Sequence, residues 1–222
     1  MKSLDEFDWK ALEMELDVQG AAILREVFSA SEIDDLLTAL HQKGSLTPPL
    51  QLASTHAGSG KVSELVGPLP TILRELGVSL YARLLPIADR WNEVMGAAVS
   101  KTGARSGGLT RAEITSLVRE DLVLLHQGSQ AAGGFALDAM LLVSQPGQDF
   151  DGGELAMTEQ RPRMQSRPMV VPLKLGDIAI FSGGQRPFKG SKGFYKVTLK
   201  SAVSRVRDGE RVALNLFFGE MP

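Results

Sequence analysis

The sequence contains no cysteine, which excludes disulfide bonds, thiolate metal ligands and cysteine nucleophiles. Histidine is scarce as well, with three copies at His41, His56 and His126. Aromatic residues make up 6% of the chain and the net charge is −2, so the composition gives no general drive toward nucleic acid or an anionic membrane. No apolar run approaches the roughly 20 residues that cross a bilayer, and the acidic N-terminus lacks the apolar segment of a secretory signal. These absences predict a soluble cytoplasmic domain without a nucleic-acid or membrane partner.

The first half of the chain is predicted to be mainly helical. The 222 residues are 43% hydrophobic, which is enough to bury one sizeable core. Apolar residues recur at helical spacing in three segments, and capping residues stand before two of them. The expected elements are a helix from Ser3 to Gly20, a strand over 21–24, a helix after Ser29 and a helical stretch over 70–95. We interpret 42–66 as a loop or lid and 98–110 as a connection.

The second half is predicted to be a set of short strands. Gly152-Gly153 allows backbone angles closed to other residues, and a second turn is expected at Gly176-Asp177. The expected strands lie at 139–143, 154–158, 169–173, 178–181, 197–199 and 211–218. Short strands separated by turn signals favour a β-sandwich or barrel.

Several motifs in this half are similar to one family. The string Ser144-Gln-Pro-Gly-Gln-Asp-Phe-Asp-Gly-Gly-Glu154, followed by Glu159-Gln-Arg-Pro-Arg-Met-Gln-Ser-Arg167, resembles bacterial 2-oxoglutarate/Fe(II) oxygenases related to prolyl 4-hydroxylases. The resemblance implies a mainly β fold, a cupin-like double-stranded β-helix (jelly roll) spanning about 118–219. We therefore expect a single domain over 1–222, with helical support from 1–110 packed on one sheet and a jelly-roll core in 111–222.

The resemblance also implies a site, which this chain keeps only in part. In the family a His-x-Asp pair and a later His hold Fe(II), and a basic residue about ten positions beyond grips 2-oxoglutarate. His126 matches the first ligand, but Gly128 and Ser201 stand at the other two positions, while Arg211 falls at the gripping position. The resemblance thus implies a degenerate metal site with a retained anion clamp. No cofactor is firmly predicted, and Fe(II) with 2-oxoglutarate applies if the family activity persists.

Strand alternation adds further candidates. Asp138, Met140 and Leu142 share one face of their strand, and the resemblance places that face toward the cofactor pocket. Asp138 is predicted either to transfer protons together with His126 or to form an ion pair with Arg211, Arg205 or Lys200. Asn215 lies on the same strand face as Arg211, where it lines the pocket or bonds a neighbouring strand. The basic run 161–167 is interpreted as a solvated loop paired with Asp149, Asp151 or Glu154.

Three classes of function remain open, and with them the question of whether the protein is an enzyme. The first is metal-independent chemistry or binding of a small molecule in the barrel pocket, with His126 and Asp138 as the proton-transfer pair and Arg211 as the anchor. The second is an active iron- and 2-oxoglutarate-dependent hydroxylase with rewired ligands. The third is a non-catalytic protein that binds a ligand or a protein partner. The two replaced ligands weigh against the second class, and Asp138 favours the first over the third.

Overall fold

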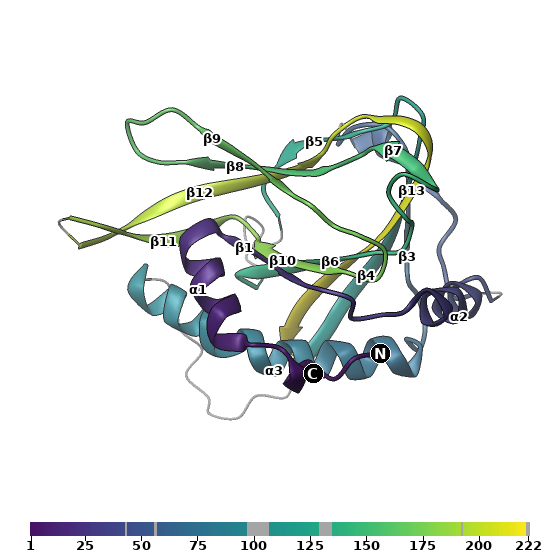
Figure 1. Cartoon of the computed structure of the whole chain (residues 1–222), viewed down its shortest axis with the longest axis horizontal. Coiled ribbons are helices and arrows are strands. Elements are labelled where there is room, and N and C mark those ends of the chain that lie inside the picture. The colour runs from purple at the N-terminus through teal and green to yellow at the C-terminus, as the bar shows by residue number, and fades with distance from the viewer. Residues whose placement is uncertain (43, 56, 97–106, 129–134, 192, 221–222) are drawn as a thin grey trace.

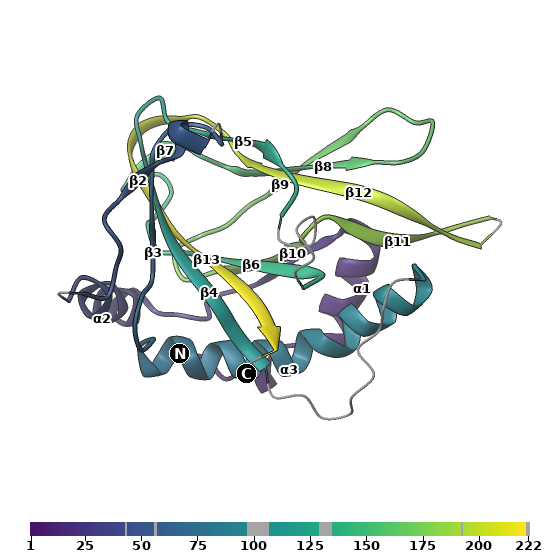
Figure 2. The ribbon, with the colours of Figure 1, turned by 180° about the vertical axis from the view of Figure 1, so that it is seen from behind.

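Two antiparallel sheets face each other, and helices cover the outer side of the larger sheet (Figures 1 and 2). The computed structural model describes residues 1–42, 44–55, 57–96, 107–128, 135–191 and 193–220. The predicted mainly β fold with helices packed on one sheet is confirmed, and its two facing sheets are those of a jelly roll. No helix in these ranges is long and apolar enough to span a membrane.

The larger sheet has eight strands and the smaller one has five. The larger follows the order β1-β10-β6-β13-β4-β3-β2, with β7 beside β13, and the smaller follows β11-β12-β8-β9, with β5 beside β12. The larger sheet contains β1 (Ala21–Leu24), β2 (Leu50–Gln51), β3 (Lys61–Glu64), β4 (Gly107–Val118), β6 (Leu137–Leu142), β7 (Phe150–Gly152), β10 (Ile178–Ser182) and β13 (Val206–Glu220). The smaller contains β5 (Val123–His126), β8 (Leu155–Gln160), β9 (Arg167–Val171), β11 (Gln185–Gly190) and β12 (Gly193–Val203).

Local signals fix the helix ends. The helices are η1 (Leu4–Glu6), α1 (Trp9–Gln19), α2 (Ala30–Leu40), η2 (Leu52–Thr55) and α3 (Thr71–Val94). Ser29 caps α2 with a complete capping box, as its sequence predicts. Ser3 caps only the short turn η1, and the cap of α1 is Asp8. Gly20 ends α1 at φ 78°, a left-handed angle that favours glycine.

Alternation along β6 separates two apolar clusters. Leu137, Ala139 and Leu141 pack toward the helices, whereas Met140 and Leu142 join the cluster between the two sheets. The sequence predicted this division of the strand. The space between the sheets is therefore lined by one face of β6, and the same holds for the strands paired with it.

The predicted boundary between helical support and jelly-roll core is wrong. Strands β1, β2 and β3 come from the first 110 residues, and all three belong to the larger sheet. The segment 42–66, predicted as a loop, contains β2, η2 and β3. Strand β4 begins at Gly107, inside the segment 98–110 that was predicted to be a connection, while 97–106 lie outside the described residues. N-terminal segments therefore form both edges of the larger sheet, with β1 at one edge and β2 at the other.

Candidate functional site

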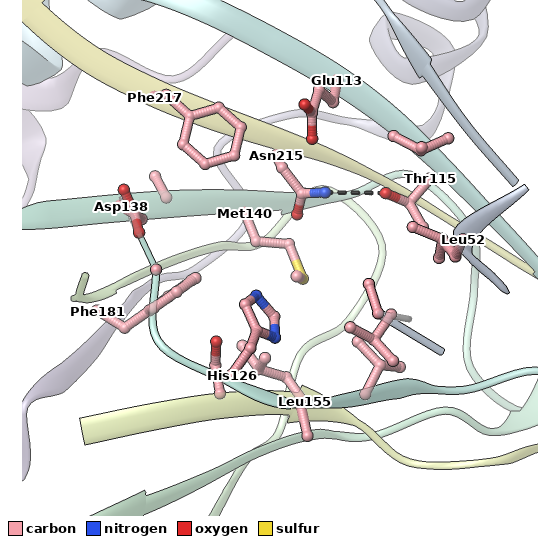
Figure 3. A pocket seen from close by; sticks show the side chains of 18 of the residues that line it. Leu52, Glu113, Thr115, His126, Asp138, Met140, Leu155, Phe181, Asn215 and Phe217 are labelled. Carbon is pink, nitrogen blue, oxygen red and sulfur yellow. Dashed lines mark hydrogen bonds between the residues drawn. The ribbon is translucent and has the colours of Figure 1, made fainter. Parts of the chain in front are cut away.

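A cavity of about 400 Å³ lies between the two sheets. The larger sheet contributes inward residues from β4, β6 and β13, and the smaller contributes residues from β5, β8 and β12. Figure 3 shows His126 and Met140 reaching into this space, with Asn215, Phe217 and Glu113 on the side of the larger sheet. The cavity also has an apolar lining that includes Leu52, Val62, Val123, Leu155, Phe181 and Val203.

Arg211 is buried in the wall of this cavity with 1% of its surface exposed. Its Nη2 donates to Sδ of Met140 at 3.2 Å, and its Nε has no partner. Burial lowers the pKa of Arg211 to about 10, so the guanidinium is still charged at neutral pH. Among the described residues, no carboxylate oxygen lies within 4.0 Å of it. The predicted pairing of Arg211 with Asp138 is therefore wrong, because Met140 occupies the nearest position instead.

Asn215 lies four residues further along β13 and faces the same cavity. Its amide nitrogen donates to Oγ1 of Thr115 at 2.9 Å (Figure 3), and in the sheet it stands between Met140 and Glu113. Both sequence alternatives for Asn215 therefore hold, since it lines the cavity and bonds a neighbouring strand. The pKa of Glu113 is raised first by burial and then by nearby Glu64, against the lowering effect of Arg111.

His126 ends β5 and presents its ring to the cavity (Figure 3). Its Nδ1 lies 2.9 Å from the carbonyl oxygen of Leu124, so Nδ1 must be the protonated donor. That tautomer leaves the lone pair of Nε2 available to a ligand or a proton. Ser201 stands directly opposite His126 in the pairing of β5 with β12. The sequence predicted that His126 and Ser201 stand at two ligand positions of one site, and their direct pairing in the sheet is consistent with that prediction.

The carboxylate of Asp138 fills the space next to Gly128. A Cβ atom on Gly128 would lie 2.2 Å from Oδ2 of Asp138 and 3.1 Å from Cα of Gly183. Asp138 is 3% exposed and comes from β6 in the larger sheet, whereas His126 and Ser201 belong to the smaller sheet. The carboxylate of Asp138 thus occupies the space where the side chain of residue 128 would begin. An aspartate at 128 and the present position of Asp138 exclude each other.

Comparisons with known proteins agree with this architecture. Residues 60–221 match the model of an oxygenase family described as catalysing oxidative methylation of damaged DNA. An uncharacterised protein of Mycobacterium tuberculosis is 32% identical over 161 residues, which cover 68% of this chain and 69% of the relative. The chain belongs to this oxygenase family.

Solved structures share the fold of this oxygenase-family member at low identity. A prolyl 4-hydroxylase from Pseudomonas putida superposes with a TM-score of 0.63 at 13% identity, covering 96% of this chain and 100% of the other. A 2-oxoglutarate/Fe(II) oxygenase from Burkholderia pseudomallei gives 0.61 at 19% identity, covering 98% and 94%. At these identities the likeness establishes the fold, and the chemistry depends on the residues of the cavity.

Among the described residues, the donors near this cavity fall short of the three that facial iron coordination uses. Facial coordination needs three strong protein donors, and the described residues contain no group of three His, Cys, Asp or Glu side chains able to hold a metal. The imidazole of His126 and a carboxylate from Asp138 are two, and the hydroxyl of Ser201 is a weak donor when neutral. His56 lies outside the described residues. The guanidinium of Arg211 is the buried cation in the wall of this cavity.

Five of the six predicted site residues line the cavity. They are His126, Asp138, Met140, Arg211 and Asn215. Leu142 is not among the lining residues, because it is buried in the apolar cluster between the sheets beyond the cavity. Sequence reasoning missed Glu113 and Thr115, since β4 was not recognised as a strand. Alternation along 107–118 was the signal that could have found them.

The predicted partners of the basic run 161–167 are wrong. Arg161 donates to Glu159 at 2.6 Å, and Arg167 donates to the side chain of Gln19 in α1 at 2.9 Å. Glu154 instead accepts from Ser204, and this hydrogen bond is the main cause of its lowered pKa. These contacts place the run on the smaller sheet, away from the turn that was predicted to hold it.

Proposed function

We propose that this protein binds a small carboxylic acid in the cavity between its sheets and acts on it by proton transfer, without a resident metal. The observation that carries the proposal is Arg211, a buried cation beside the cavity that has no carboxylate of the described residues within 4.0 Å. An unpaired buried charge is costly, and a ligand carboxylate would remove that cost through a charge-assisted hydrogen bond. Nε of Arg211 has no hydrogen-bond partner, and a ligand carboxylate would reach the guanidinium by displacing the side chain of Met140.

The other polar groups of the cavity support an acid–base role. His126 offers Nε2 as a proton acceptor from the smaller sheet, and Asp138 offers a carboxyl group from the larger sheet. A ligand anchored on Arg211 would lose a proton to one group and regain one from the other, so the reaction class is an isomerisation or an exchange. The family description names damaged DNA as a substrate, and the described residues hold no group of three His, Cys, Asp or Glu side chains that could bind a metal for oxidation.

A panel of ligands tests the anchor. We expect 2-oxoglutarate and glutarate to raise the melting temperature of metal-free protein in EDTA, since a ligand that binds only the folded state stabilises it. The neutral dimethyl ester of 2-oxoglutarate should have no effect. Arg211→Met should abolish the shift, whereas Arg205→Met, which changes an exposed arginine, should keep it. Equal shifts in Arg211→Met and the parent protein would refute the proposal.

Hydrogen exchange tests the chemistry. In D₂O with EDTA, the protein should accelerate exchange of the protons next to the ketone of 2-oxoglutarate, followed by NMR. A positioned base contributes about 10²-fold or more, so His126→Gln should return exchange to near the buffer rate while leaving binding intact. Binding without exchange would leave a non-catalytic carboxylate-binding protein.

A second candidate function is an iron-dependent oxygenase in which Asp138 replaces the carboxylate missing at residue 128. It is favoured by the 2.2 Å separation between Oδ2 of Asp138 and the absent Cβ of Gly128. Anaerobic titration with Co(II) and 2-oxoglutarate separates the two functions. A d–d absorption band that saturates at one equivalent, and is lost in both His126→Ala and Asp138→Ala, would select the oxygenase.

A further inference from the structure

Positive charge is concentrated in one part of the chain. Between Leu155 and Val203 the sequence holds nine basic and two acidic residues, while the remainder holds 15 basic and 24 acidic residues. Both acids in the stretch are fully buried, Glu159 with Arg161 and Arg186, and Asp177 with Arg25. The exposed charges of the described residues in this stretch are therefore all positive. The net charge of −2 is therefore the sum of a basic stretch, 155–203, and an acidic remainder.

Much of this charge lies on a hairpin that projects from the body. Strands β11 and β12 form a ribbon that extends beyond the helices, beside the hairpin of β8 and β9 (Figures 1 and 2). Within the described part of the chain, no helix covers the outer face of this sheet. Register places Lys189 opposite Phe194 and Pro187 opposite Lys196, so these side chains share one face. Lys200 follows on the same face four residues after Lys196. We call Lys189, Phe194, Lys196 and Lys200 the outer hairpin face.

The outer hairpin face combines cations with one exposed aromatic ring. All three lysines are exposed, and Phe194 is 56% exposed, although a phenylalanine on a strand normally packs inward. On the opposite face the rings of Phe188 and Tyr195 are in tilted contact, and the guanidinium of Arg161 lies 3.9 Å from the ring centre of Phe188. Strand rise separates Lys196 from Lys200 by about 13 Å. This spacing suits alternate phosphates along an extended strand better than a single small anion.

We propose that the outer hairpin face binds single-stranded nucleic acid. Lysines without interleaved acids complement a polymer of uniform negative charge, and an exposed ring offers a stacking surface to an unpaired base. A surface that binds an acidic polypeptide would combine charged, polar and apolar side chains. A surface that binds a membrane would carry several exposed apolar side chains. Phe194 is the exposed large apolar side chain among the described residues of this hairpin. The same strand β12 also lines the cavity at Ser201, on the face opposite to Lys200.

Fluorescence anisotropy with a labelled 20-nucleotide oligothymidylate tests the proposal. The parent protein should bind it at low salt, with affinity that falls as salt rises. The triple variant Lys189→Glu, Lys196→Glu, Lys200→Glu should bind at least tenfold more weakly, and its salt slope should be shallower by about 2, since each phosphate contact on a single strand contributes about 0.7. Phe194→Ala should weaken binding severalfold without changing the salt slope.

The matched control carries the same change in charge elsewhere. Lys10→Glu, Lys61→Glu, Arg74→Glu alters three exposed cations outside the hairpins and should bind within threefold of the parent. Equal losses in the two triple variants would overturn the proposal, because they would show only a net-charge effect. Absence of oligonucleotide binding, or equally tight and lysine-dependent binding of polyglutamate or anionic vesicles, would also overturn it. Melting temperatures of the variants and carboxylate binding in the cavity report separately on the fold and on the proposed function.

Discussion

Arg211 is a cation that the fold buries without giving it a carboxylate. Its replacement by methionine, which has a similar length and no charge, should raise the free energy of unfolding by about 1–3 kcal/mol in ligand-free protein. Denaturant unfolding measures this difference. Arg186→Met is the control, because the other fully buried guanidinium is paired with Glu159 and its loss should destabilise the fold. A lower free energy of unfolding in Arg211→Met would contradict this prediction, because it would show that interactions within the protein already compensate the buried charge.

The same residue gives a pH dependence with a definite sign. Burial lowers the pKa of Arg211 to about 10, below its value in the unfolded chain, so the unfolded state holds the proton more tightly. The cost of the buried charge is therefore full below pH 10 and declines as pH rises above it. The difference in unfolding free energy between the parent and Arg211→Met should stay constant from pH 6 to 9 and shrink above pH 10. A difference that grows with pH would have the wrong sign.

Gly128 and Asp138 should be coupled energetically. Gly128→Ala places a methyl group in contact with Oδ2 of Asp138 and should cost about 1–3 kcal/mol of stability, since nearby Gly183 also limits movement. In the Asp138→Ala background the same change should cost little. A double-mutant cycle measured by chemical denaturation gives the coupling. Additive effects would contradict the exclusion of the two side chains.

Individual residues differ in how far the sequence could predict them. His126 and Arg211 were predictable because motif spacing fixes their places along the chain. Asp138 was predictable as an inward-facing residue of its strand. Its position next to Gly128 depends on the packing of segments that are distant in the sequence, so local residue spacing does not predict it. Glu113 and Thr115 were missed because β4 was not recognised as a strand. They reach the cavity because β4 pairs with β13, about 100 residues away.

At the scale of elements, one buried ion pair joins α1 to the smaller sheet. Arg186 donates to the carbonyl oxygens of Asp17 and Val18 at the end of α1, at 2.6 and 2.9 Å, and pairs with Glu159 in β8. Glu159→Gln should cost about 3–5 kcal/mol, because it leaves a buried guanidinium without full compensation. Glu120→Gln, in the exposed pair with Arg205, should cost less than about 1 kcal/mol. Equal costs, measured by thermal or denaturant unfolding, would contradict this role.

Elements with local signals were predicted well, and those that depend on distant partners were not. The strand over 21–24 and the helices after Ser29 and Pro70 match the structure because caps, turns and apolar spacing are local. Strand β4 begins with two glycines and carries charged residues, so its intrinsic preference for a strand is weak. Pairing with both β13 and β3 stabilises it, and the sequence of β4 alone does not indicate those partners.

At the scale of the whole molecule, the family resemblance was enough to predict the two-sheet fold and to locate its cavity. Composition was less informative, because a net charge near zero concealed the basic stretch from Leu155 to Val203. The two regions have different consequences. The cavity holds a single buried cation suited to a small acid, and the projecting hairpin holds exposed cations suited to a polymer.

The most direct test of the proposed function is calorimetric titration of 2-oxoglutarate into metal-stripped protein in EDTA, repeated anaerobically with Fe(II). The guanidinium of Arg211 is in place without a metal, so we expect one equivalent to bind in EDTA, with affinity that Fe(II) changes less than about threefold. Arg211→Met should remove the heat of binding under both conditions. Binding that appears only after Fe(II) is added, or that survives in Arg211→Met, would contradict the account.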